Sequence, residues 1–320
     1  MKKFIYYAAN LISKIIPKTF FEVSLQSKLK SIDQYDKDYI MYRVNYYNKT
    51  NSRFKLSNPY SWKSFSKNTV VTDVENPSII IRNSINSAYY NDFMEYLRFF
   101  DKSKTFGVAF YDLIKIPTEP LFVKSRPISG ENQNSVLLKL DKLRHFRYVC
   151  DNLKFEDKKN AIVFRGQCGV PHRRIFIEKY HGMKNSDFGD SHKLSIGKPY
   201  STKHLSINDQ LKYKYILSIE GVDVATNLKW IMNSNSLCFM VKPKYETWFM
   251  EGDLIPDYHY VLLKDDYSDI QEKMDYYNNN PNDALKIIKI ANEYVNQFKD
   301  TKRESLISLY VMKKYFDLSS

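Results

Sequence analysis

Short apolar runs alternate with amphipathic segments in the second half of the chain. The apolar runs have the length and composition typical of buried strands, and the segments between or after them have helical spacing. Strands that alternate with helices of this length favour a parallel α/β sheet. We expect strands at 161–166, 215–221, 236–241 and 258–263, and helices at 173–182, 224–235, 266–277 and 281–298.

The first half of the chain has a less regular pattern. A β-branched run at 78–82 precedes a segment with helical spacing at 91–100, and GVAFYD predicts a strand that ends at Asp112. After the apolar run 121–123, residues 134–149 again have helical spacing. We expect these elements to form a separate first domain.

The stretch DNLKFEDKKN at 151–160 is charged and hydrophilic, and it marks the expected domain boundary. A chain of 320 residues is long enough for two domains of ordinary size. We predict an N-terminal domain at 1–150 and a C-terminal domain at 151–320, with the last helix free to return to the first domain.

The N-terminus combines basic residues with an apolar helical stripe. Lys2, Lys3, Lys14 and Lys18 flank apolar positions that recur at helical spacing between residues 4 and 16. The segment lacks a small-residue cleavage site and is too short and too charged to span a bilayer. Two interpretations stay open: a helix lying in the plane of a membrane, or an ordinary amphipathic helix packed on its domain.

Composition indicates a folded protein with an anionic partner. Hydrophobic residues make up 43% of the chain, which excludes disorder of the whole chain. The formal net charge of +13 favours a nucleic acid, an anionic membrane or a phosphorylated ligand, although part of it reflects a composition rich in Lys, Asn, Ile and Tyr. Cys150, Cys168 and Cys238 have neither disulfide nor zinc spacing, so we expect reduced thiols.

Two strand-to-helix turns carry residues suited to an anion. The first, in YILSIEGVDVATNLKW, leads into a helix expected to begin near Val224 with Asp223 as its N-cap. The first turn of a helix offers free N–H groups and the positive end of the helix dipole. Lys229 can reach back toward an anion there, and Thr226 and Asn227 can add hydrogen bonds.

The second turn, FRGQCGVPHRR, also lies between a predicted strand and a predicted helix. Arg165 ends the strand, Gly166 frees the loop backbone, and Arg173 and Arg174 open the helix. Arginines in such a turn can clamp a phosphate in bidentate fashion. In open α/β sheets, ligands bind beyond the carboxyl ends of the strands, where both turns are expected to lie.

The two turns and their surroundings resemble glycosyltransferase family 90. The likeness is densest in KYKYILSIEGVDVATNLKWIMNSNSLCFM and KPKYETWFMEGDLIPDYHYVLLKDDYSDIQEKMDYYNNNP, and FRGQCGVPHRR matches the Phe-Arg-Gly element of the family. FVKSRPI and NSVLLKLDKLRHF are also similar to bacterial members. The resemblance therefore extends over residues 90–300 and is weak before them.

The resemblance implies an α/β protein of GT-B architecture, with two Rossmann-like domains facing a cleft and the sugar nucleotide on the C-terminal one. It implies inverting transfer of glucose or xylose, without a metal ion or other cofactor, from a UDP-sugar to a glycan hydroxyl such as one in lipopolysaccharide core. The expected partners are the UDP-sugar, a glycan or lipid-linked glycan acceptor and an anionic membrane, but no nucleic acid. The expected location is cytoplasmic, peripheral to the inner membrane.

The resemblance also implies roles for individual residues. Inverting transfer needs a base for the acceptor hydroxyl, and Asp112 takes the place of the family's carboxylate, with Glu119 as the alternative. The acceptor side is expected at Lys124, Ser125 and Arg126. The expected donor-binding residues are Arg165, Gly166, Arg173, Asp223, Thr226, Asn227, Lys229, Tyr245, Glu246 and Glu251.

No metal site is expected. The only Asp-x-Asp, Asp36–Lys37–Asp38, follows polar residues far from the donor elements and is interpreted as a solvated surface, and the six histidines have no metal spacing. Two other functions stay open. A nucleic-acid-binding protein is suggested by the charge and the 26 tyrosines, and an inactive membrane-associated scaffold is disfavoured by the presence of Asp112.

Overall fold

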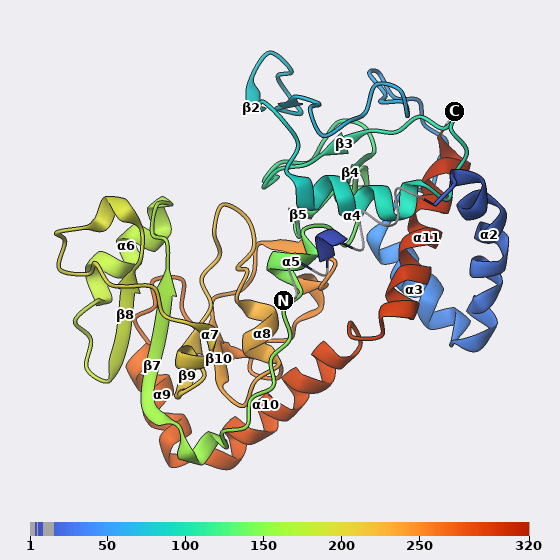
Figure 1. Ribbon diagram of the computed structural model, residues 1–320. Helices are drawn as coiled ribbons and strands as arrows, with labels where there is room; N and C mark the ends of the chain where they lie inside the picture. The colour runs from blue at the N-terminus through green and yellow to red at the C-terminus, as the bar shows by residue number, and fades with distance from the viewer. Residues whose placement is uncertain (1–3, 5, 9–15, 320) are drawn as a thin grey trace. The chain divides into compact units, whose positions relative to one another are not determined.

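The computed structural model describes residues 4, 6–8 and 16–319 of the chain (Figure 1). The chain divides into two compact units, each of which is described by itself. Unit 1 comprises Met1–Arg144, Tyr245–Met250 and Phe298–Ser320, and unit 2 comprises His145–Lys244 and Glu251–Gln297.

A five-stranded parallel sheet forms the centre of unit 2 (Figure 1). Its strand order is β12-β10-β9-β7-β8, so the chain runs from β7 outward to β8 and then returns to β9 on the other side of β7. This reversal creates a topological switch point of the Rossmann-like kind between β7 and β9. The strands are β7 (Lys159–Gly166), β8 (Ser186–Asp190), β9 (Tyr213–Leu217), β10 (Leu237–Met240) and β12 (Val261–Leu262).

Apolar side chains at strand and helix spacing build the core of unit 2. Phe164 of β7 and Phe188 of β8 pack against Phe176, with ring centroids 5.8 and 5.0 Å away. Ala284 and Ile288 lie four residues apart on one helix and join the same buried cluster. The helices are α6 (Pro171–Tyr180), α7 (Ile207–Gln210), α8 (Leu228–Met232), α9 (Ile270–Asn279) and α10 (Pro281–Asn296), with short 3₁₀ turns at Phe155–Asp157, Lys193–Ser195 and Glu251–Asp253.

Among the described residues, unit 1 has three small sheets and several helices (Figure 1). Strands β3, β4 and β6 are parallel, while β1 pairs with β2 and β5 with β11 in antiparallel fashion. The strands are β1 (Val71–Thr72), β2 (Ile80–Arg82), β3 (Val108–Ala109), β4 (Leu121–Val123), β5 (Ser125–Pro127), β6 (Ser135–Leu137) and β11 (Tyr245–Thr247). The helices are α2 (Lys18–Lys30), α3 (Lys37–Tyr47), α4 (Ser87–Leu97), α5 (Lys142–His145) and α11 (Thr301–Leu318), with 3₁₀ turns at Ser31–Gln34 and Asn132–Asn134.

The last helix, α11, fixes the parallel sheet of unit 1. The ring of Tyr315 lies 4.1 Å from that of Phe122 on β4. The Tyr315 hydroxyl accepts a hydrogen bond from the Gly107 N–H and donates one to the Pro120 carbonyl, at 3.0 and 2.9 Å. The strands β3 and β4 are therefore held at their N-terminal ends, and Asp112 and Lys124 come after their C-terminal ends.

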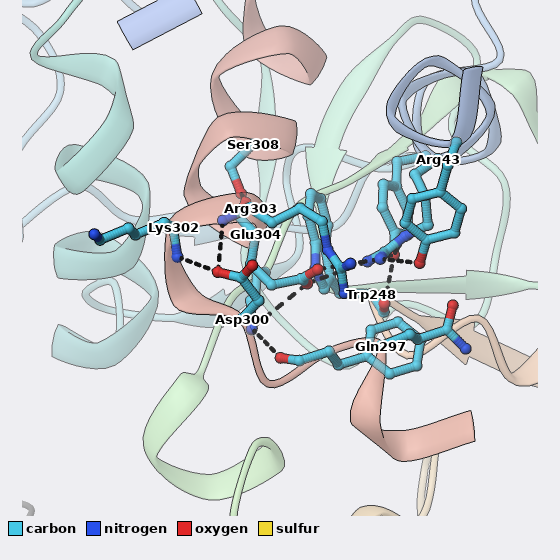
Figure 2. A network of polar contacts seen from close by, with 12 residues as sticks. Arg43, Trp248, Gln297, Asp300, Lys302, Arg303, Glu304 and Ser308 are labelled. Atoms are coloured by element: carbon cyan, nitrogen blue, oxygen red, sulfur yellow. Dashed lines mark hydrogen bonds and ion pairs between the residues drawn. The ribbon is translucent and has the colours of Figure 1, made fainter. Parts of the chain in front are cut away.

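A buried polar network joins three distant segments of unit 1 (Figure 2). Arg43 of α3 donates two hydrogen bonds of 3.1 Å to the Glu304 carboxylate of α11, and the indole N–H of Trp248 donates to the same carboxylate. Tyr47 stacks on Trp248 with ring centroids 3.8 Å apart and donates to the Trp248 carbonyl. The segment 245–250 therefore belongs to the core of unit 1, and Trp248 is fully buried.

The structure corrects several expected elements. Residues 134–149 contain strand β6 and only one helical turn, α5, because Ser135–Leu137 pairs in parallel with β4. Strand β8, in the polar sequence SDFGD, was not expected. The expected C-terminal domain also loses Tyr245–Met250 to unit 1, because β11 pairs with β5, whereas the last helix joins unit 1 as the sequence allowed.

The expected N-terminal helix lies largely outside the described residues, which omit 1–3, 5 and 9–15. Of the described part, Tyr6 donates a hydrogen bond of 2.7 Å to the buried Asp92 carboxylate of α4. Lys18 opens α2, pairs with Glu22 and lies over the Trp62 ring. No helix in the described ranges combines the length and apolar content needed to cross a bilayer.

Candidate functional site

The two predicted anion-binding turns lie side by side at the switch point of the unit 2 sheet. One follows β7 and the other follows β9, and these strands are neighbours in the sheet. Because parallel strands end at the same edge, their loops open in the same direction. This is the place where open α/β sheets bind ligands.

Arg173 on α6 joins the two turns. Its guanidinium donates to the carbonyls of Ile219 and Glu220 at 2.5 and 2.8 Å, and to that of Gln167 at 3.2 Å. The adjacent His172 ring nitrogen lies 2.8 Å from the Glu220 carbonyl. Burial lowers the pKa of Arg173, against smaller opposing effects of neighbouring groups. The pKa nevertheless stays far above neutral pH, so the guanidinium is charged. Arg173 therefore shapes the turns through their backbone.

The turn after β9 differs from its expected form. Helix α8 begins at Leu228, with Asn227 as N-cap, so Asp223 is not the N-cap and the helix starts four residues later than expected. The Asn227 amide accepts from Ser218 Oγ at 3.0 Å and donates to the Leu217 carbonyl at 3.3 Å. Residues 218–227 therefore form a long loop closed at its base by Asn227. Asp223 is buried in this loop and Thr226 is half-buried.

Lys229 and Glu251 form a fully buried ion pair. Both residues were expected at the donor site, and the structure brings them together through their side chains. Removing either charge alone leaves the other buried without its partner, which is strongly destabilising. Any contact of Lys229 with a phosphate would share the ammonium with Glu251.

Arg165 lies along the sheet, away from the loops. It pairs with Asp187 on β8 and donates to Thr202 Oγ1 at 2.8 Å, and its Nε is buried without a hydrogen-bond partner among the described residues. The close approach requires Gly189, where a Cβ would lie 1.7 Å from the Arg165 guanidinium. Sequence reasoning missed Asp187, Gly189 and Thr202, since no pattern pointed to strand β8.

The expected donor residues Tyr245 and Glu246 lie in unit 1. They form strand β11, and Glu246 accepts a hydrogen bond of 2.7 Å from Arg126 on the paired strand β5. Arg126 also donates to backbone carbonyls, including those of Tyr46 and Ser135, and is fully buried. Arg126 and Glu246 therefore form an internal ion pair of unit 1.

Asp112 lies just beyond β3, where the parallel sheet of unit 1 ends. Lys124, one residue after β4, donates to its carboxylate at 2.5 Å, and Arg144 lies 3.8 Å away. Burial raises the pKa of Asp112, but Lys124 and then Arg144 outweigh it and hold the pKa below its ordinary value. Its side chain remains 30% exposed, whereas that of Lys124 is buried.

Other expected residues occupy structural positions. Ser125 is fully buried, and the alternative base Glu119 accepts a hydrogen bond of 2.8 Å from the Ser57 N–H. Asp36 is the N-cap of α3 and accepts from Asp38 and Tyr39. Within the described residues, no group of three or more His, Cys, Asp or Glu side chains gathers as metal ligands.

A pocket of about 400 Å³ lies elsewhere in unit 2, beside β12. Residues before β12 and on α9 and α10 line it, including Asp257, Tyr276 and Asp283. None of the expected site residues lies in its wall. The candidate site is therefore defined by the strand ends, and not by this pocket.

Comparison with known proteins identifies the family of the chain. The model of "Glycosyl transferase family 90" matches residues 139–319. "O-glucosyltransferase LpsA" of Dichelobacter nodosus is 48% identical over 232 residues, which cover 72% of this chain and 73% of the relative. "Protein O-glucosyltransferase 1" of Homo sapiens is 30% identical over 149 residues, which cover 44% of this chain and 38% of that protein. The chain therefore belongs to glycosyltransferase family 90.

Proposed function

We propose that the protein transfers a glucosyl or related hexosyl or pentosyl group from a UDP-sugar to a hydroxyl of a cell-surface glycan, such as lipopolysaccharide core. The observation that carries the proposal is the meeting of both predicted turns at the switch point of a sheet in a family 90 chain. The Dichelobacter nodosus relative is named as an O-glucosyltransferase, which supports glucose as the sugar.

The proposal assigns the diphosphate to the backbone of the two turns of unit 2. Arg173 holds these turns together, and Lys229 of the buried Lys229–Glu251 pair lies on α8, the helix that follows the loop after β9. Fixed dipoles and charges that stabilise the developing charge of the leaving UDP lower the barrier without a metal ion. The GT-B arrangement implied by the resemblance is part of this proposal.

The proposal assigns the base to Asp112. The acceptor oxygen bonds to the anomeric carbon on the face opposite UDP, the bond from that carbon to UDP breaks, and the acceptor proton passes to the carboxylate. A pKa held low by Lys124 keeps Asp112 ionised at neutral pH, which is the state a base needs. Inversion at the anomeric carbon follows from a single displacement.

The proposal also places the protein at the cytoplasmic face of a membrane, because a lipid-linked acceptor would be located there. The net charge of +13 and the basic N-terminal segment support this location.

The test is a transfer and hydrolysis screen with UDP-glucose, UDP-xylose, UDP-galactose and UDP-N-acetylglucosamine, each with and without EDTA. We expect turnover of UDP-glucose or UDP-xylose that survives EDTA, and a product of inverted anomeric configuration by NMR. Loss of activity in EDTA with rescue by Mn²⁺ would refute the metal-free mechanism. Thermal stabilisation by single-stranded DNA but not by UDP would favour the nucleic-acid-binding alternative.

A further inference from the structure

The β1–β2 hairpin of unit 1 exposes three consecutive isoleucines. Ile79, Ile80 and Ile81 have exposed fractions of 51%, 59% and 38%. Successive residues of a strand point to opposite faces, so Ile80 and Ile81 expose apolar side chains on both faces of β2. Single exposed apolar residues are ordinary, but a contiguous exposed cluster indicates a surface that something covers.

Basic residues lie at the base of the hairpin. Lys67 accepts a backbone hydrogen bond from Ile85, which places it beside the chain that leaves β2 at Arg82. Lys67 and Arg82 are exposed and form no ion pair with any residue that the structure describes. The exposed isoleucines therefore lie beside basic side chains at the base of the hairpin, while the turn between β1 and β2 carries Asp73 and Glu75.

The acidic residues of the hairpin are already engaged. Glu75 pairs with Lys115, and the Asp73 carboxylate accepts the N–H groups of Glu75 and Asn76 in the turn before Ile79. These carboxylates therefore repel an anionic partner less strongly than carboxylates without such contacts would.

The hairpin is also tied to the segment that carries Asp112. The Val74 N–H donates to the Tyr111 hydroxyl at 3.2 Å, and the Glu75–Lys115 pair lies on the other side of Asp112 in sequence. Ile114, in the same segment, is 46% exposed. Whatever binds the hairpin is thus held near the candidate base of unit 1.

We propose that the β1–β2 hairpin is a membrane anchor, which inserts Ile79, Ile80 and Ile81 into an anionic phospholipid surface while Lys67 and Arg82 contact the headgroups. Exposed isoleucines beside basic side chains match the two parts of such a surface, the acyl chains and the anionic headgroups. Exposed isoleucines on both faces of β2 suit a fluid apolar medium, whereas a protein partner would cover one face. The anchor deepens the membrane contact of the proposed function by assigning it to a surface near Asp112.

The first experiment measures sedimentation of the full chain with phosphatidylcholine vesicles that contain or lack phosphatidylglycerol. The test variant replaces Ile79, Ile80 and Ile81 by Ser, and the matched control replaces Leu194 and Ile196, which are 81% and 78% exposed in unit 2. We expect the wild type and the control to bind phosphatidylglycerol vesicles. The test variant should bind them at least about tenfold more weakly. All three positions are exposed, and equal thermal melting of the variants checks that the fold is intact.

The second experiment reports insertion directly. Ile80→Trp should show a blue-shifted emission on these vesicles and be quenched by lipids with brominated chains, whereas Ile196→Trp should not.

Three outcomes would overturn the anchor. They are equal vesicle binding by the wild type and the test variant, greater loss in the Leu194 and Ile196 variant, and a wild-type dimer that the test variant converts to a monomer. Transfer to a soluble acceptor, assayed without vesicles, tests the proposed function separately, so failure of the anchor leaves that result unchanged.

Discussion

Asp112 combines two properties that oppose each other in a general base. Lys124 and Arg144 keep the carboxylate ionised, but the same charges make it a weaker proton acceptor. Because the pKa of Asp112 in the folded protein is below its ordinary value of 3.8, the ion pair stabilises the fold at pH values above 3.8. This stabilisation is lost as the pH falls through the lower pKa of the folded state. Lys124 is in this sense a positioning residue for the candidate base.

Two substitutions test this pair. We expect Asp112→Asn to lower the transfer rate by about 10²–10⁴-fold with UDP affinity unchanged, because Asp112 belongs to unit 1 and both turns belong to unit 2. In Lys124→Met, burial acts with less opposition and the Asp112 pKa rises, so the acidic limb of kcat/KM should move to higher pH. Near-normal transfer by Asp112→Asn would move the role to Glu119 or elsewhere, and an unmoved acidic limb would separate Lys124 from the base.

Lys229 requires a test that separates binding from stability. In Lys229→Ala, the buried Glu251 carboxylate loses its partner, so we expect about 3–5 kcal/mol of destabilisation besides weaker UDP binding. The double variant Lys229→Met/Glu251→Gln removes both charges and should recover most of that stability.

The UDP affinity of the double variant decides the role of Lys229. If the ammonium contacts a phosphate, affinity should fall by about 1–3 kcal/mol in the double variant as well. Isothermal titration with UDP measures this, and an unchanged affinity would restrict Lys229 to the core of unit 2.

At the scale of elements, the sequence pattern predicted the strands of unit 2 that have strong apolar runs, and it missed β8, which has none. Strands β7, β9 and β10 carry such runs, whereas β8 reads SDFGD, with an aspartate and a glycine inside the sheet. Gly189 is there because the Arg165 side chain crosses it, a tertiary reason that no local pattern contains. Likewise, the run SVLL at 135–138 fits a strand or a helix, and only pairing with β4 decides between them.

Arg173 offers a prediction about the joined turns. Arg173→Lys keeps the charge but cannot donate to the carbonyls of Ile219, Glu220 and Gln167 in the same planar geometry. We expect weaker UDP binding and faster hydrogen exchange in residues 218–224. The matched control is Arg174→Lys, the exposed neighbour on α6, which should change neither. Weaker binding with unchanged exchange would indicate a direct phosphate contact instead of positioning.

At the scale of the whole chain, residues 245–250 belong to unit 1 although the sequence on both sides of them belongs to unit 2. Proximity in sequence grouped Tyr245, Glu246 and Glu251, yet the first two lie on β11 beside Arg126 while Glu251 pairs with Lys229 in unit 2. Arg126 and Glu246 are 120 residues apart, so their ion pair could not be read from spacing. The sequence left open that the last helix joins the first domain, but it did not predict the ion pair between Glu304 of α11 and Arg43 of α3.

That ion pair supports the last prediction. Glu304 is buried and accepts from Arg43 and Trp248, with the Lys139 ammonium 3.6 Å away. Although burial lowers it, Tyr47 and Glu304 raise the pKa of Arg43 above its ordinary value, so the guanidinium stays charged inside unit 1. Glu304→Gln keeps the shape but leaves these cations without a counter-charge, and we expect it to destabilise unit 1 by about 3–5 kcal/mol.

Urea unfolding in a Trp230→Phe background measures this effect, because the remaining tryptophans, Trp62 and Trp248, both lie in unit 1. The control is Glu293→Gln, the same change at an exposed ion pair on α10, which should cost less than about 1 kcal/mol. If the two variants unfold at the same urea concentration, the network contributes packing alone. A large loss confined to Glu304→Gln would mean that its charge holds α3, the 245–250 segment and α11 together, and with them the frame on which β3 and β4 present Asp112 and Lys124.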